Sequence, residues 1–86
     1  MPTLHREAGY IFLIVMFDCL ERRHVHVTGN GKGGAKVWLE PIELGAPGRY
    51  NEHEIRRIVE IVRGKHETII RRWDEECARA RQEQEQ

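Results

Sequence analysis

The sequence predicts an α+β fold, in which a three-stranded antiparallel sheet is followed by one long C-terminal α-helix packed on one face of the sheet (β-β-β-α). Three observations predict this class. Residues 10–17 form an unbroken apolar run, residues 24–28 and 35–40 alternate between apolar and polar side chains, and apolar residues recur every three or four positions from 55 to 77. A chain of 86 residues has room for a single domain, 1–86, and we expect residues 1–8 and 81–86 to be flexible ends.

The first predicted strand is the run Tyr10–Phe17, which is apolar on both faces, as in a central strand covered on both sides. Its eight residues are far fewer than the ~20 that span a bilayer as a helix. Glu7 before the run and the absence of a small-residue cleavage site after it argue against a signal peptide. Because one helix covers only one face of a sheet, we expect a partner or a second copy to bury the other face.

The second and third predicted strands form a hairpin. His24–Thr28 places both histidines on one face and both valines on the other. A loop with four glycines, Gly29–Gly34, connects it to Ala35–Glu40, and this third strand ends at Pro41. If apolar side chains pair with apolar ones, the opposite face gathers the histidines with Lys36, Trp38 and Glu40. Residues 42–50 contain Gly and Pro and are predicted to be a loop.

The helix is predicted to begin after Asn51, which is a good N-cap and has Glu54 at the capping-box spacing. Its apolar stripe consists of Ile55, Ile58, Val59, Val62, Ile69, Ile70, Trp73 and Cys77. This unbroken spacing favours one long amphipathic helix. A break at Gly64-Lys65 into two helices is the alternative, since glycine weakens a helix interior.

Charge and cysteine content argue against some classes of protein, namely highly charged binders of nucleic acid or membrane and disulfide-rich secreted proteins. The 14 basic and 14 acidic side chains cancel, so the whole molecule has no field that attracts nucleic acid or a membrane surface. Any basic patch is therefore local. Cys19 and Cys77 are too few for a secreted disulfide framework, which predicts free thiols in a reducing cytoplasm.

The polar face of the hairpin is the candidate site. An imidazole of His24 or His26 can remove the proton of a ribose 2′-hydroxyl, with Lys36 stabilising the developing charge and Glu40 orienting a histidine. These four are the candidate catalytic residues. The candidate binding residues are cations and an aromatic ring around them: Arg22, Arg23, Lys32 and Trp38.

Other interpretations of the same residues stay open. In one the histidines are polar residues without chemistry on an outer sheet face, and in another they are contacts in a binding surface. Trp38 can anchor a protein interface as well as stack on a base. A metal site is a further alternative. Cys19 and the two histidines offer at most three ligands, and no second Cys or His pair stands at a ligand spacing, so we predict no metal and no cofactor.

Several of these features together resemble one bacterial family, the domain of unknown function forty-one-sixty. They are the opening Met1-Pro2-Thr3, the apolar first strand, His24-Val25-His26-Val27, the glycine-rich loop, the strand Ala35–Pro41 and Trp73 near the end of the helix. Family members often carry prolines before the first histidine. Arg22 and Arg23 stand there in this chain, which predicts a less rigid and more basic turn.

The resemblance implies a gene that stands beside a second small gene, in the manner of toxin–antitoxin pairs. The order of parts is also similar to the HicA-type ribonuclease toxins, although a strand here replaces their leading helix. We therefore expect a toxin-like component of a bacterial type II module, acting in the cytoplasm as a metal-independent ribonuclease on RNA. Its expected partners are a cognate antitoxin and a second copy in a homodimer, with no membrane. The alternative is a non-catalytic protein-interaction or nucleic-acid-binding module, antitoxin-like or accessory.

Overall fold

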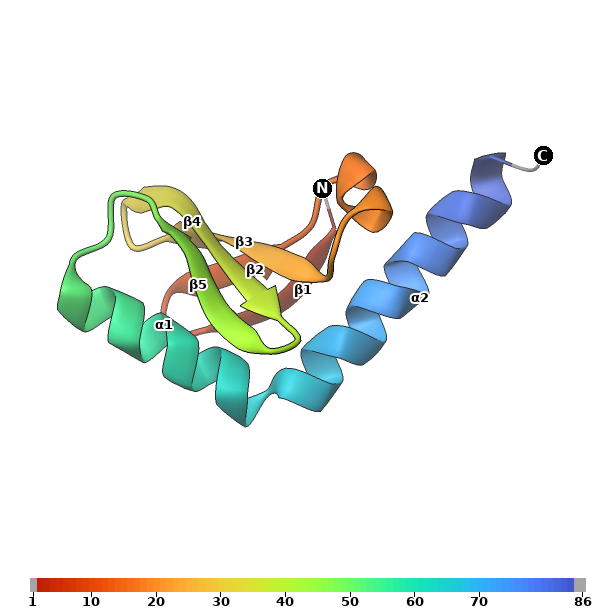
Figure 1. Cartoon of the computed structure of the whole chain (residues 1–86). Helices are drawn as coiled ribbons and strands as arrows, with labels where there is room; N and C mark the ends of the chain where they lie inside the picture. Colours follow the sequence, from red (N-terminus) through yellow and green to blue (C-terminus); the bar gives the residue numbers. More distant parts are fainter. Residues whose placement is uncertain (1, 85–86) are drawn as a thin grey trace.

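The chain folds into a five-stranded antiparallel sheet with two helices along one side (Figure 1). The computed structural model describes residues 2–84, and the side chains of residues 16, 17 and 84 lie outside that description. The strands follow one another across the sheet in sequence order, as a meander. They are β1 (Thr3–Glu7), β2 (Tyr10–Leu13), β3 (His24–Gly29), β4 (Lys32–Leu39) and β5 (Ile42–Pro47), with the 3₁₀ helix η1 (Met16–Leu20) between β2 and β3, and α1 (Glu52–Gly64) and α2 (His66–Gln84) after β5.

The predicted three-stranded sheet is wrong because both of its edges carry a further strand. β1 adds to β2 and β5 adds to β4. Neither has a long apolar run: Leu4 is the buried residue of β1, and β5 contains Gly45 and ends at Pro47. Edge strands tolerate such sequences, since one side of their backbone needs no ladder partner. Part of the predicted flexible N-terminus, residues 3–7, is therefore a paired strand, and most of the predicted loop 42–50 is β5.

The apolar run Tyr10–Phe17 is also not one strand. It stays extended through β2, and Val15 then precedes the turn of η1. The N–H of Val15 donates to Oδ2 of Asp18 across 2.8 Å, which satisfies a backbone donor where the strand ends. An apolar run alone does not mark that point, because strand and buried turn have the same composition here.

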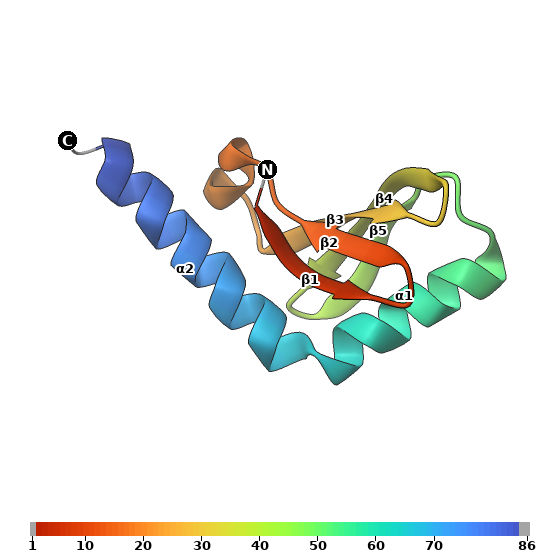
Figure 2. The same ribbon diagram turned by 180° about the vertical axis from the view of Figure 1, so that it is seen from behind.

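The single long helix is wrong as well, and the alternative break at Gly64-Lys65 is confirmed. α1 ends at Gly64 and α2 begins at His66. An imidazole nitrogen of His66, Nε2, lies 2.6 Å from the carbonyl oxygen of Leu39 and fixes the junction against the end of β4. The two helices form a V that runs along one side of the sheet, with α2 continuing past it (Figures 1 and 2). The predicted capping box of Asn51 and Glu54 is present at the start of α1.

The core lies between the sheet and the V of the helices. The predicted register is confirmed, since Val25 pairs with Val37 and Val27 with Ala35. The side chains of these four residues are buried together with the helix residues Ile58, Val62, Ile69 and Trp73. Because alternation places neighbours on opposite faces, the histidines and Trp38 belong to the face away from the core.

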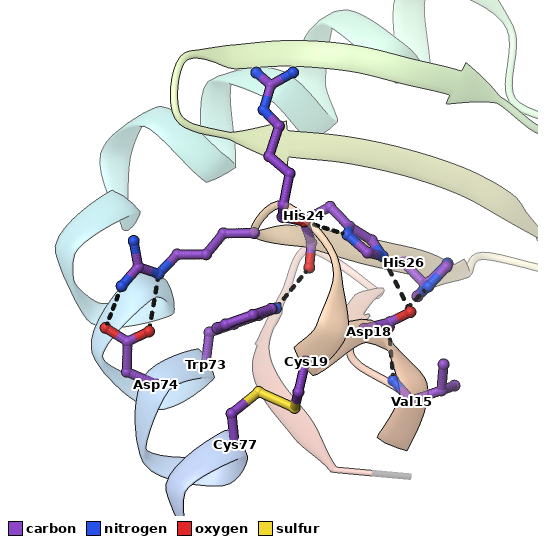
Figure 3. Close-up of a disulfide and its surroundings, with 10 residues drawn as sticks. Val15, Asp18, Cys19, His24, His26, Trp73, Asp74 and Cys77 are labelled. Carbon is purple, nitrogen blue, oxygen red and sulfur yellow. Dashed lines mark hydrogen bonds and ion pairs between the residues drawn. A yellow bond between two sulfur atoms is a disulfide. The ribbon is translucent and has the colours of Figure 1, made fainter.

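The predicted free thiols are wrong. Cys19 of η1 and Cys77 of α2 form a disulfide across 58 positions of sequence. This bond attaches η1 to the helix layer, as Figure 3 shows. Within residues 2–84, no helix combines the length and the apolar character needed to cross a membrane.

Candidate functional site

The site is built where η1 reaches the face of the sheet opposite the helices. Cross-strand pairing aligns His24 with Trp38 and His26 with Lys36 on β3 and β4. Directly opposed residues on one face lie close enough for their side chains to interact. η1 then places Asp18 beside the histidine pair, as Figure 3 shows.

The carboxylate of Asp18 contacts both imidazoles, one with each oxygen. Its Oδ1 lies 3.1 Å from Nε2 of His24, and its Oδ2 lies 2.9 Å from Nε2 of His26. On the far side of the His24 ring, Nδ1 lies 2.7 Å from the carbonyl oxygen of Arg22. We call Asp18, His24 and His26 the His–Asp cluster.

The three members of the His–Asp cluster differ in exposure. The side chain of His24 is 0% exposed and that of Asp18 is 5% exposed, whereas that of His26 is 37% exposed. His24 is thus enclosed, and a substrate can reach the cluster only on the side of His26. Burial raises the pKa of the Asp18 carboxyl, but the hydrogen bond from the Val15 backbone N–H and the adjacent His26 imidazole lower it by more, so its pKa lies below the usual value.

Trp38 and two cations lie next to the cluster. The Trp38 ring packs edge to face on His24, with ring centroids 5.3 Å apart. The ammonium of Lys36 lies 4.3 Å from the Trp38 centroid, and the guanidinium of Arg22 lies 4.7 Å from it. The structure therefore gathers five of the sequence-predicted residues at one place: Arg22, His24, His26, Lys36 and Trp38.

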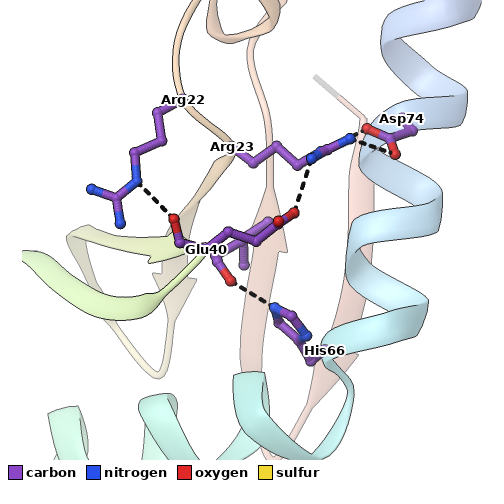
Figure 4. A network of polar contacts seen from close by, with 6 residues as sticks. Arg22, Arg23, Glu40, His66 and Asp74 are labelled. Atoms are coloured by element: carbon purple, nitrogen blue, oxygen red, sulfur yellow. Dashed lines mark hydrogen bonds and ion pairs between the residues drawn. The ribbon is translucent and has the colours of Figure 1, made fainter.

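The other three predicted residues have different neighbours. Arg23 donates to both oxygens of Asp74 on α2, at 2.8 and 2.9 Å, and to Glu40 at 2.9 Å, so it joins β3, the end of β4 and α2 (Figure 4). These bonds hold the pKa of Arg23 above its usual value, mainly through Asp74. The described contacts of Glu40 are with arginines rather than with a histidine. Lys32 pairs with Glu54 at the start of α1.

Asp18 is the member of the candidate site that the sequence did not single out. It directly follows the apolar run and precedes the His pair, which made it look like part of a polar connection. The only signal in the sequence is the position of Asp18 in a short polar segment between two predicted neighbouring strands. Such a segment has to bring the chain back beside the strand that it has just left. A carboxylate in that segment then lies near the first residues of the next strand.

The His–Asp cluster supports two kinds of chemistry. A carboxylate that fixes an imidazole is the arrangement used to orient a general base. The ligand-type atoms of the three residues also all lie within 4.8 Å of one another, which suits a metal ion. Both uses place the reactive group beside Lys36 and Trp38.

The fold and the site define a small α+β domain with helices on one sheet face and a His–Asp cluster with a basic, aromatic border on the other. The chain belongs to the family described as Domain of unknown function (DUF4160), whose model matches residues 9–74. The resemblance stated from the sequence is thereby confirmed, and the match includes the whole cluster. Neither the curated proteins nor the solved structures contain a significant match to the chain.

Proposed function

We propose that this protein is the toxin-like component of a two-gene bacterial module and that it cleaves RNA at the His–Asp cluster. The observation that carries the proposal is the pairing of His26 with Lys36 across β3 and β4. It sets a half-exposed member of the cluster beside a cation that has no ion pair among the described residues.

The border of the cluster suits a ribonucleotide chain. The ammonium of Lys36 and the guanidinium of Arg22 offer donors to a phosphodiester, and the half-buried Trp38 ring offers an apolar surface for a base. Because the bases of single-stranded RNA are unpaired, an aromatic ring can pack on one of them without opening a duplex.

RNA supplies every atom that the reaction needs. The ribose 2′-oxygen forms a bond to phosphorus while the bond from phosphorus to the 5′-oxygen breaks. The proton lost by the 2′-hydroxyl is matched by the one gained at the 5′-oxygen, and the products carry a 2′,3′-cyclic phosphate and a 5′-hydroxyl. In this proposal the His–Asp cluster takes the first proton, and Lys36 stabilises the charge that develops on the phosphoryl oxygens.

The test combines growth with cleavage of a defined RNA. Expression of the chain alone is expected to arrest growth, and coexpression of the neighbouring gene is expected to relieve the arrest. Purified protein is then incubated with a single-stranded oligoribonucleotide, and the ends of the fragments are identified by mass. We expect His26→Ala to lower cleavage by at least ~100-fold and Lys36→Ala by ~100-fold. His53→Ala on α1 and Lys65→Ala at the turn between α1 and α2, both at exposed positions, are the matched controls and keep full activity.

An oligonucleotide with a single 2′-deoxyribose at the cleaved position should resist cleavage there. If the wild type leaves RNA intact, or if His26→Ala cleaves as well as the wild type, the proposal is wrong. The non-catalytic alternative then has support from the half-buried apolar residues Ile11 and Leu13, which are the cross-strand neighbours of Thr28 and His26. Substituting them with Ser would weaken binding of the neighbouring gene's product, or formation of a homodimer, and leave any RNA assay unchanged.

Action on RNA places the protein in the cytoplasm, where disulfides are uncommon. Whether the Cys19–Cys77 bond forms in the cell therefore tests the proposed cytoplasmic location, independently of the RNA assay. Thiols are alkylated in intact cells, and the mass of the purified chain then reports whether the two cysteines were bonded.

A further inference from the structure

The ring of His24 has a defined arrangement of its two nitrogens. Nδ1 lies 2.7 Å from the carbonyl oxygen of Arg22, and a carbonyl oxygen only accepts hydrogen bonds. Nδ1 therefore carries the proton. In the neutral ring, Nε2 then presents a lone pair.

That lone pair faces another acceptor. Nε2 of His24 lies 3.1 Å from Oδ1 of Asp18, and both side chains are shielded from water. Oδ2 of Asp18 already accepts the N–H of Val15 and lies 2.9 Å from Nε2 of His26. The Nε2 atoms of both histidines are buried, and within residues 2–84 neither makes a hydrogen bond of acceptable geometry.

Buried acceptors that face one another need a positive centre among them. A second proton on His24 would supply the charge, but its N–H would not point well at the carboxylate. A divalent cation meets the requirement directly, because it takes the lone pairs of both imidazoles and one carboxylate oxygen together.

We propose that Asp18, His24 and His26 bind one divalent transition-metal ion of the zinc class. Two imidazoles and one carboxylate form a ligand set of catalytic zinc, which keeps a further position for water or substrate. Bonds of 2.0–2.1 Å in a tetrahedron set ligand atoms about 3.3 Å apart. With one Asp18 oxygen as the ligand, its separation from the nearer Nε2 is close to this value, at 3.1 Å for Oδ1 and His24 or 2.9 Å for Oδ2 and His26, and all three ligand atoms lie within 4.8 Å of one another.

The surroundings of the three ligands also fit a metal centre. The Arg22 carbonyl fixes the tautomer of His24, and the Val15 amide fixes the carboxylate, as outer partners of metal ligands do. Both histidines stand on one strand at i and i+2, and the disulfide of Cys19 attaches the turn of Asp18 to α2. The site is thus held by regular structure.

The sequence prediction of no metal depended on Cys19 as the third ligand. In the structure the sulfur of Cys19 is bonded to Cys77, and Asp18 provides the third ligand atom instead. The catalytic meaning of the ion rests on the proposed function, since a metal-bound water would be the group that takes the 2′-hydroxyl proton. Binding of the ion does not rest on that function.

The test measures metal binding without RNA. The chain is purified without a histidine tag, dialysed against a chelator, and titrated with Zn²⁺ by calorimetry and with Co²⁺ by visible absorption. We expect one equivalent per chain, visible cobalt bands, and a melting temperature raised by about 10 °C at a hundredfold excess of Zn²⁺ over its Kd. Asp18→Asn and His26→Gln, checked for native circular dichroism, should each weaken binding at least ~100-fold, because each removes a direct ligand. His53→Ala, an exposed histidine on α1, should bind like the wild type.

Two results would overturn the metal site. One is a wild type that takes up no more zinc than the Asp18→Asn/His26→Gln double variant. The other is a loss of binding in His53→Ala equal to that in His26→Gln. If the protein binds zinc but leaves RNA intact, the proposed function is wrong and the metal site stands. If the protein takes up no zinc and still cleaves RNA in the presence of a chelator, the metal site is wrong and the proposed function stands.

Discussion

The indole N–H of Trp73 donates a hydrogen bond to the carbonyl oxygen of His24 across 3.0 Å, and the bond is buried. It connects α2 directly to the strand that carries the histidine pair. Trp73 is 6% exposed and belongs to the core. Trp73 therefore fixes the position of His24 from the helix side of the sheet, while Asp18 contacts its ring from the other side.

Trp73→Phe removes the indole N–H and leaves the carbonyl oxygen of His24 without this hydrogen-bond donor. We expect the free energy of unfolding to fall by about 2–4 kcal/mol, which combines an unsatisfied buried acceptor with a small cavity. Chemical denaturation followed by circular dichroism measures the loss. Ile70→Val on the same helix, at a partly buried position, is the control and should cost about 1 kcal/mol or less. Equal losses in the two variants would contradict a specific role for the hydrogen bond.

The disulfide between Cys19 and Cys77 should be a major source of stability. It closes a loop of 58 positions, and the chain-entropy model assigns such a loop about 4 kcal/mol. We expect a dithiol reductant to lower the urea midpoint of the wild type and to leave that of the Cys19→Ala/Cys77→Ala double variant unchanged. A wild-type midpoint that does not respond to the reductant, with the thiols shown by mass to be free, contradicts this prediction.

The two histidines should differ in their effect on stability. A His→Ala change on a half-exposed sheet face would cost little stability, but of the two histidines only His26 is half-exposed. His24→Ala leaves a buried cavity and removes the partners of the Arg22 carbonyl and of Asp18, so we expect a loss of about 2–5 kcal/mol. His26→Ala should cost about 1 kcal/mol or less. Denaturation in the presence of a chelator separates this difference from any effect of bound metal, and equal costs would contradict the burial of His24.

The hairpin that carries the site could be predicted well from the sequence. Alternation in His24–Thr28 and Ala35–Glu40 determines which side chains share a face, because period two is a local property of a strand. Matching the apolar sides also determined the register, which pairs His26 with Lys36. The Asn51 cap could be predicted for the same reason, as its partner Glu54 is three residues away.

Features that depend on distant contacts could not be predicted. Edge strand β5 has a composition typical of a loop, and its pairing with β4 is what makes it a strand. The sequence offered the break at Gly64-Lys65 only as an alternative to one long helix, because the contact of His66 with Leu39, 27 positions earlier, is not visible in local spacing. Asp18 belongs to this group too, because its contact with the histidines exists only when η1 has folded back against β3.

Arg22 and Arg23 show the limit of reading adjacent charges as one patch. Their side chains diverge: Arg22 packs on Trp38, and Arg23 packs on Trp73 and pairs with Asp74. The two side chains leave the bend at residues 21–23 in different directions, and only Arg22 lies beside the His–Asp cluster. The other one holds α2 to the sheet.

The last prediction concerns the start of α1 and its dependence on pH. The Glu54 carboxylate accepts hydrogen bonds from the Lys32 ammonium and from the backbone N–H of Asn51, the latter across 3.2 Å. These bonds, that of Lys32 first, hold the pKa of Glu54 below its usual value. A carboxyl group whose pKa is lower in the folded protein than in the unfolded chain contributes stability above its unfolded pKa. That contribution disappears as the pH falls through the folded pKa.

Glu54→Gln should therefore lower the urea midpoint at about pH 7, and the difference from the wild type should shrink at about pH 3 or below. Comparing the two proteins at each pH cancels the titration of groups that they share, Asp18 included. Glu52→Gln, in the same first turn of α1, is the matched control, because no bond to Lys32 or to the Asn51 amide is formed at position 52. Its difference from the wild type should be smaller at about pH 7 and should change less with pH. A Glu54→Gln difference that stays constant from about pH 7 to about pH 3 would show that the Lys32 contact contributes nothing to folding.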